Sequence, residues 1–167
     1  MLSVLAMVMS AMAASPDSKR TVTVPRAVSG SLEGICSFVP KDYDGDGNLG
    51  PWDVVTVSDS IGVLRHLGVT VMHTAQRPWP DGTATDGQVT ITAANGDEIH
   101  GTYVAVTLPA PEPGHLIGKA TFIIDGGTGR FAHASGEIEA TAFITMGIIG
   151  YYELWPATWV LEGTISY

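Results

Sequence analysis

The stretch from residue 42 to residue 53 has the residue types and spacing of a calcium-binding loop. Oxygen-bearing side chains recur at alternate positions and an acid closes the stretch; the candidate ligands are Asp42, Asp44, Asp46, Asn48 and Asp53. Calcium takes about six to eight oxygen ligands, and a sharply turning loop can wrap one ion with alternate residues. Gly47 permits that turn. We therefore predict a structural calcium site, with a solvated Asp/Gly-rich turn as the alternative.

Other motifs that carry chemistry are weak or missing. The five histidines have no H-x-H or H-x-x-x-H spacing, which gives zinc little support. His73 shares strand parity with neighbouring valines and is predicted to face the interior, as a hydrogen-bonded core residue or as a general acid or base. Neither a nucleophile elbow nor a phosphate-binding loop is present. The sequence predicts no organic cofactor and assigns no catalytic residue.

The elements that must position these residues are strands. Beyond residue 20, apolar and polar residues alternate, and turn signals recur about every ten residues, which is typical of all-β proteins. Asn95-Gly96 is a two-residue hairpin signal. We predict a small, closed, antiparallel β-barrel of about eight strands, with a two-sheet sandwich as the alternative. The expected strands are Thr21–Val24, Val28–Phe38, Val54–Val57, Ile61–His66, Val69–Ala75, Gln88–Ala93, Glu98–Leu108, His115–Ile124, Glu137–Thr145, Ile148–Leu154 and Thr158–Ser166.

The alternation also predicts which side chains face the lumen. Residues two apart share one face of a strand. The apolar sets of the last strands therefore point inward together, while Glu137, Glu139 and Glu162 face outward. The predicted ligand-contacting residues are His73, Phe122, Ile124, Ile144 and Leu161.

Composition and the first residues bear on the class and location of the protein. The chain of 167 residues has a net charge of -9 and no cluster of Lys or Arg, which excludes nucleic acid as a partner. The apolar run Met1–Ala14 ends in an A-x-A pattern and predicts a signal peptide too short to span a bilayer. Its alternative is an N-terminal helix packed on the barrel. We predict a secreted or periplasmic protein with a signal peptide at 1–14, an extension at 15–27, a barrel domain at 28–167 and no membrane insertion of the mature chain.

Three stretches occur in a recognisable order, namely Arg65–Gly68, Ala94–Tyr103 and Asp125–Gly136. The most specific is the G-G-T-G-R-F turn that starts at Gly126. Together they resemble the allene oxide cyclase/dirigent barrel superfamily, especially its exported bacterial members, over roughly Val28–Tyr167. The resemblance implies an eight-stranded barrel with a cavity open at one end, often in dimers or trimers. It also implies that enzymes of this type guide cyclisation or coupling of apolar molecules without metal or organic cofactor.

Three functions fit these observations. The first is an exported barrel that binds a small apolar molecule in its lumen. The second is a cofactor-independent isomerase or cyclase of the allene oxide cyclase type, which folds a flexible substrate in the same pocket. The third is a packed structural barrel that interacts through its outer face. The presence of a lumen cavity separates the first two from the third.

Overall fold

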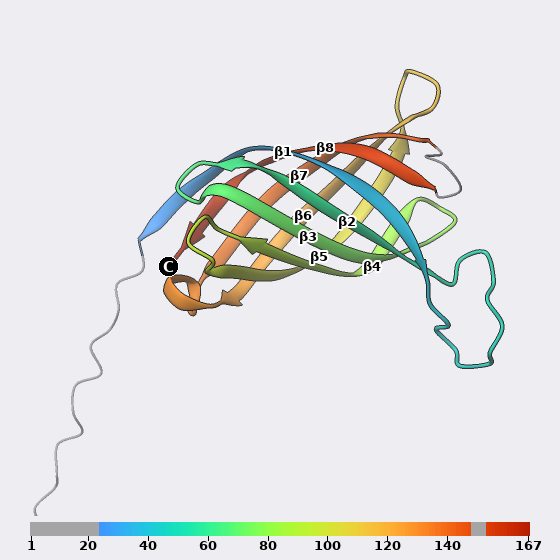
Figure 1. The fold of residues 1–167 in the computed structure, drawn as a ribbon, viewed down its shortest axis with the longest axis horizontal. Coiled ribbons are helices and arrows are strands. Elements are labelled where there is room, and N and C mark those ends of the chain that lie inside the picture. Colours follow the sequence, from blue (N-terminus) through green and yellow to red (C-terminus); the bar gives the residue numbers. More distant parts are fainter. Residues whose placement is uncertain (1–23, 148–152) are drawn as a thin grey trace, which may run out of the picture.

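Eight antiparallel strands form a closed barrel in the computed structural model, which describes residues 24–147 and 153–167. Each strand pairs with the next in sequence, and β1 pairs with β8 to close the sheet (Figure 1). The all-β barrel prediction is confirmed, and the sandwich alternative is excluded. The strands are β1 (Pro25–Pro40), β2 (Val54–Leu64), β3 (Gly68–Pro78), β4 (Thr83–Thr92), β5 (Glu98–Pro109), β6 (His115–Gly127), β7 (Ser135–Thr145) and β8 (Leu154–Ser166).

The strand bounds differ from expectation at several places; β1 begins at Pro25 and not at Val28, and β4 begins at Thr83 and not at Gln88. The predicted strands Val54–Val57 and Ile61–His66 form one continuous strand that ends at Leu64, because Ser58 and Ser60 face inward and keep the alternation intact, while Arg65 and His66 are in the following turn. The predicted strand Thr21–Val24 lies outside the described residues except for Val24, which is not in a strand. Of Ile148–Leu154, only the last two residues are described, and Leu154 begins β8.

The Asn95-Gly96 hairpin is present, but its loop is longer than two residues. The Ala93 N–H donates to the Asp97 carbonyl, and the Gly96 N–H donates to the Ala93 carbonyl. Gly96 alone of the central residues has a positive φ, of 85°. This is the three-residue type of hairpin loop, in which a left-handed glycine follows a tight turn.

The end of the barrel that carries the C-terminus is filled with large side chains. Figure 1 shows a short 3-10 turn, η1 (Gly129–Phe131), at this end. Phe131 is fully buried, and its ring meets Tyr167 edge-on at 4.6 Å between centroids. Fully buried aliphatic residues continue the filling: Val28, Leu32, Leu64, Met72, Ile91, Ile99, Ile138, Leu161 and Ile165. In the described part of the chain, no helix is long and apolar enough to cross a membrane.

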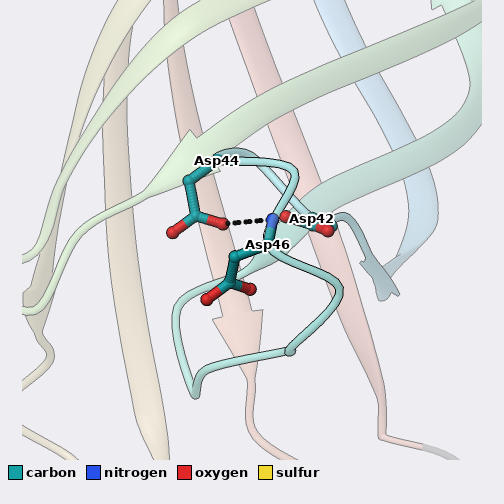
Figure 2. Close-up of side chains that lie close together, drawn as sticks. All are labelled: Asp42, Asp44 and Asp46. Carbon is teal, nitrogen blue, oxygen red and sulfur yellow. Dashed lines mark hydrogen bonds between the residues drawn. The ribbon is translucent and has the colours of Figure 1, made fainter.

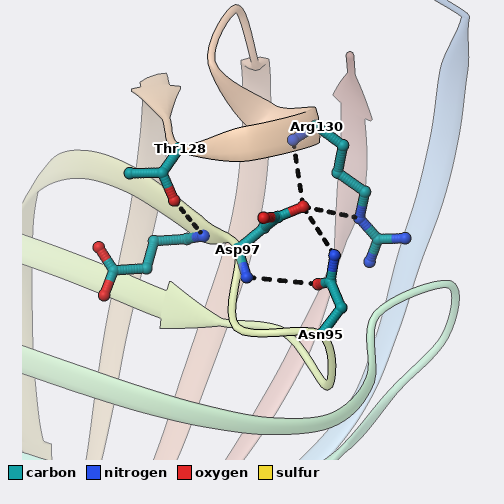
Figure 3. A network of polar contacts seen from close by, with 5 residues as sticks. Asn95, Asp97, Thr128 and Arg130 are labelled. Carbon is teal, nitrogen blue, oxygen red and sulfur yellow. Dashed lines mark hydrogen bonds and ion pairs between the residues drawn. The ribbon is translucent and has the colours of Figure 1, made fainter.

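Polar contacts between two turns hold this closed end together (Figure 3). The Asp97 carboxylate accepts hydrogen bonds from the Arg130 backbone N–H at 3.1 Å and from the Asn95 side-chain amide at 2.7 Å. The Glu98 N–H donates to the Thr128 hydroxyl at 2.9 Å. The bonds that Asp97 accepts, led by that from the Arg130 N–H and followed by that from Asn95, lower its pKa. The glycine-rich stretch that begins at Gly126 therefore closes the barrel at the end away from the cavity described next.

Candidate functional site

The opposite end of the barrel encloses a cavity of about 340 Å³. The segments that connect β1 to β2, β3 to β4 and β5 to β6 lie at this end, where β7 also ends and β8 begins (Figure 1). Ligand pockets in proteins commonly measure about 300–1,000 Å³, and an eight-stranded barrel is wide enough to hold one small ligand. This cavity is therefore the candidate functional site.

Small side chains on β4 to β7 create the empty space. The residues that line this wall are Ala84, Ala105, Gly118, Ala120 and Ala142. Their positions alternate inward like those of the large residues at the closed end, but they contribute far less volume. The same eight strands form both ends of the barrel. The difference between the filled end and the cavity therefore comes from the size of the inward-facing side chains along each strand.

All four tryptophans of the chain line the cavity: Trp52, Trp79, Trp155 and Trp159. They come from the segment before β2, the segment after β3, and two positions of β8. Trp159 is buried, and its ring lies 6.3 Å from that of Phe122, while Trp155 packs edge-on against Phe38 at 4.7 Å. Large rigid aromatic surfaces of this kind bind apolar rings.

The tryptophans were not among the predicted site residues, although the sequence holds a signal for three of them. Trp52 follows Pro51, Trp79 lies between Pro78 and Pro80, and Trp155 precedes Pro156. Proline in sheets concentrates at strand ends and edges. Each tryptophan therefore marks a strand end, and in an up-and-down barrel these three strand ends fall at the same mouth.

The deepest part of the cavity contains buried hydroxyl groups. Trp159 Nε1 donates to Ser58 Oγ at 3.1 Å, and Ser58 Oγ lies 3.3 Å from Ser60 Oγ. Burial raises the pKa of the Cys36 thiol, which lines the same region, and so keeps it protonated at neutral pH. Burial likewise raises the pKa of Tyr103 to about 12, with Thr74 as its hydrogen-bonding neighbour. The floor therefore offers neutral hydrogen-bonding groups.

The Arg77 guanidinium stacks on two aromatic rings and holds the 41–53 segment, called the acidic loop, against the open end of the barrel, called the mouth. The Arg77 guanidinium lies 3.9 Å from the Tyr43 ring centroid and 4.3 Å from that of Trp79. Trp79 in turn donates from Nε1 to the Thr85 hydroxyl at 3.0 Å. Cation–π contacts with a partly desolvated guanidinium are worth about 1–2 kcal/mol each. Tyr43 belongs to the 41–53 segment, so this stack connects that segment to a cavity-lining tryptophan.

The predicted ligand-contacting residues are only partly at the cavity. Ile144 lines it. Phe122, Ile124 and Leu161 are buried, as their parity predicted, but they lie in the filled core and are not lining residues. The parity of the last strands thus identified interior residues correctly. It carried no information about which interior positions border empty space.

The prediction that His73 faces the interior is wrong. Its side chain is 51% exposed on the outer face, where Nδ1 lies 2.7 Å from the Asp59 carboxylate on the paired strand. Val69 and Val71 share this face and are exposed as well. The inward set of β3 is instead Thr70, Met72, Thr74 and Gln76. Valine favours strands on either face, so valines do not identify the inner face of β3.

The acidic loop brings three of its five candidate ligands together. Carboxylate oxygens of Asp42, Asp44 and Asp46 lie within 4.8 Å of one another (Figure 2). Asp42 accepts hydrogen bonds from the backbone N–H groups of Gly47 and Gly45, and these lower its pKa, so it is ionised at neutral pH. The Asp53 carboxylate is outside this trio and accepts from the Gly50 N–H at 2.9 Å. Asn48 lies at the turn where its N–H donates to Asp46.

The calcium site stays a prediction with a direct test. Millimolar calcium should raise the melting temperature, because a ligand that binds only the folded state stabilises it. Asp44→Asn combined with Asp46→Asn should abolish that rise, since it removes two of the three clustered charges. Differential scanning calorimetry measures both. Asp81→Asn, at the same end but outside the trio, is the matched control and should keep the full effect. An equal rise in the double variant would contradict the site.

No family model, curated protein or solved structure matches this chain.

Proposed function

We propose that this barrel binds an uncharged, mostly apolar small molecule in its lumen. The single observation that carries the proposal is the cavity of about 340 Å³ bordered by all four tryptophans. Apolar area removed from water stabilises a complex by about 25 cal/mol per Å². A rigid pocket that already exists in the closed barrel loses little conformational entropy when it is filled.

Charge at the mouth supports an uncharged ligand over an anionic one. Lys41 is the only basic residue among the described residues of the connecting segments at this end, which are 41–53, 79–82, 110–114, 146–147 and 153. The acidic residues in those segments are Asp42, Asp44, Asp46, Asp53, Asp81, Glu112 and Glu153. Like charge at a mouth lowers the local concentration of anions. A carboxylate would also lose hydration inside the lumen, where the one basic lining residue, Lys119, is exposed to solvent and not buried.

Titration with naphthalene tests the proposal. We expect saturable binding by isothermal titration calorimetry, with a negative heat-capacity change because apolar surface is buried. Fluorine NMR of protein labelled with fluorotryptophan should show shifts at several indole signals, since all four rings border the cavity. The control ligand 2-naphthoate, of similar shape but negatively charged, should bind more weakly. Absence of saturable naphthalene binding would refute the proposed function.

The isomerase or cyclase alternative would use the same cavity. It needs a group that changes the reactivity of the substrate, or a pocket shape that alone selects the reactive conformation. Apart from Lys119 and Glu153, which are exposed, the residues that line the cavity are uncharged, and this arrangement supports binding.

A further inference from the structure

We propose that the β2–β3 side of the lumen is a hydrogen-bonding subsite, and that the ligand is an uncharged ring compound with hydroxyl or carbonyl oxygens along one edge. This inference rests on the proposed function and deepens it, because it names the chemical class and the orientation of the ligand. Four polar residues form the subsite: Thr56, Ser58, Thr74 and Gln76. They are called the polar wall below.

The strand register makes the polar wall one contiguous patch. Thr56 lies directly opposite Gln76, and Ser58 lies directly opposite Thr74, on the paired strands β2 and β3. Directly opposite residues have Cβ atoms about 4.5–5.5 Å apart, and residues two apart on one strand share a face. All four side chains therefore point into the same side of the lumen, where all four line the cavity.

The polar wall has hydrogen-bonding capacity to spare near the mouth. The deeper pair is engaged: Ser58 accepts from Trp159 and contacts Ser60, and Thr74 neighbours the Tyr103 hydroxyl. The hydrogen bonds found among the described lumen side chains include neither Thr56 nor Gln76. Gln76 lies at a β-bulge, where the register between β3 and β4 shifts between Ala75 and Arg77. Bulges of this kind re-aim side chains beside functional sites.

The facing side of the lumen is apolar, which sets the shape of the ligand. Ala120, Ala142 and Ile144 on β6 and β7, with Trp155 and Trp159 on β8, provide flat and aliphatic surface. A ligand that fills this space has one edge against hydroxyl and amide groups and a body against indole rings and methyl groups. An oxygen-bearing ring compound matches both sides, whereas a pure hydrocarbon leaves the Thr56 and Gln76 groups without partners inside the cavity.

The experiment compares 2-naphthol with naphthalene, which have the same ring system and differ by one hydroxyl group. In the wild-type protein, 2-naphthol should bind about three- to tenfold more tightly, the value of one net hydrogen bond. Thr56→Val combined with Gln76→Leu should remove this preference, because neither replacement side chain can form a hydrogen bond with the naphthol hydroxyl group. Thr107→Val is the matched control, because Thr107 lines the same cavity from β5, outside the polar wall. It should keep the preference.

The outcomes separate the two proposals. If naphthalene binds but 2-naphthol has no advantage, or if the double variant keeps the full advantage, the polar wall is not a subsite and the proposed function survives. If Thr107→Val removes the preference and the double variant does not, the subsite lies on the other wall and the inference is wrong. If neither compound binds, both proposals fail. Circular dichroism of each variant verifies that the barrel is folded, and Thr56→Val alone provides a milder second variant.

Discussion

Replacing Gly118 by leucine should block ligand binding while the barrel remains folded. A Cβ at this position would lie 3.4 Å from the Cβ of Ala142 and 3.8 Å from Ile144 Cδ1, which is ordinary van der Waals contact. The remaining atoms of the leucine side chain would extend into the cavity that Gly118 lines. We expect naphthalene affinity to fall at least about tenfold, or 1.4 kcal/mol, by calorimetry. Stability should be unchanged or increased, because a filled cavity gains packing contacts.

The matched control for this prediction is Thr102→Leu. Thr102 is exposed on the outer face of β5, so the same side chain is added where it cannot reach the lumen. Affinity should then equal that of the wild-type protein. A folded Gly118→Leu variant with undiminished naphthalene binding would place the ligand outside the cavity.

Replacing Phe131 by alanine should produce the largest loss of stability among these variants. The side chain is fully buried in η1 and packs edge-on against Tyr167, so its removal leaves a void at the closed end. Truncation of a buried phenylalanine costs about 3–5 kcal/mol of the free energy of unfolding. Urea unfolding followed by circular dichroism measures this cost. Naphthalene affinity should be retained below the transition, since the cavity is at the other end of the barrel.

Phe143→Ala is the control for the stability prediction. Phe143 is 51% exposed on the outer face of β7, so the same truncation leaves no buried void. The expected change is within about 0.5 kcal/mol, as for most surface substitutions. Equal destabilisation by both variants would mean that Phe131 does not fill the closed end as a packed core residue.

The two ends of the barrel thus differ in structure: one is a packed core and the other contains the cavity. The glycine-rich turn that carries the clearest resemblance to the allene oxide cyclase/dirigent superfamily packs Phe131 into the closed end. The cavity is at the mouth, where the connecting segments contribute Trp52 and Trp79. Membership of that superfamily, export and homo-oligomer formation stay predictions. The resemblance concerns the structural end of the molecule, so it does not identify the ligand.

The strands follow from local patterning, whereas the pairing of β1 with β8, which makes the sheet a barrel and not a sandwich, was decided by the tertiary structure. Alternation over β6, β7 and β8 identified the inward residues correctly, including Phe122, Ile138 and Leu161. Asp42, Asp44 and Asp46 are three of the five predicted ligands, and their clustering also follows from the local sequence, because its geometry depends on hydrogen bonds within five residues of the chain. Such features depend on nearest neighbours in sequence, which a pattern of residue types records directly.

The cavity was decided only by the tertiary structure. Its polar wall lies on β2 and β3. On β3 the inward residues are mostly polar, and exposed valines occupy the outer face. The hydrophobic pattern therefore predicted the wrong inner face for β3 and wrongly placed His73 in the lumen. Its tryptophans come from segments between positions 52 and 159 and meet because strand pairing brings alternate connections to one end. Whether a lumen is filled depends on the summed volume of side chains from all eight strands at one level of the barrel. This summed volume cannot be read from the sequence of any single strand, because it depends on which residues of all eight strands lie at the same level of the closed sheet.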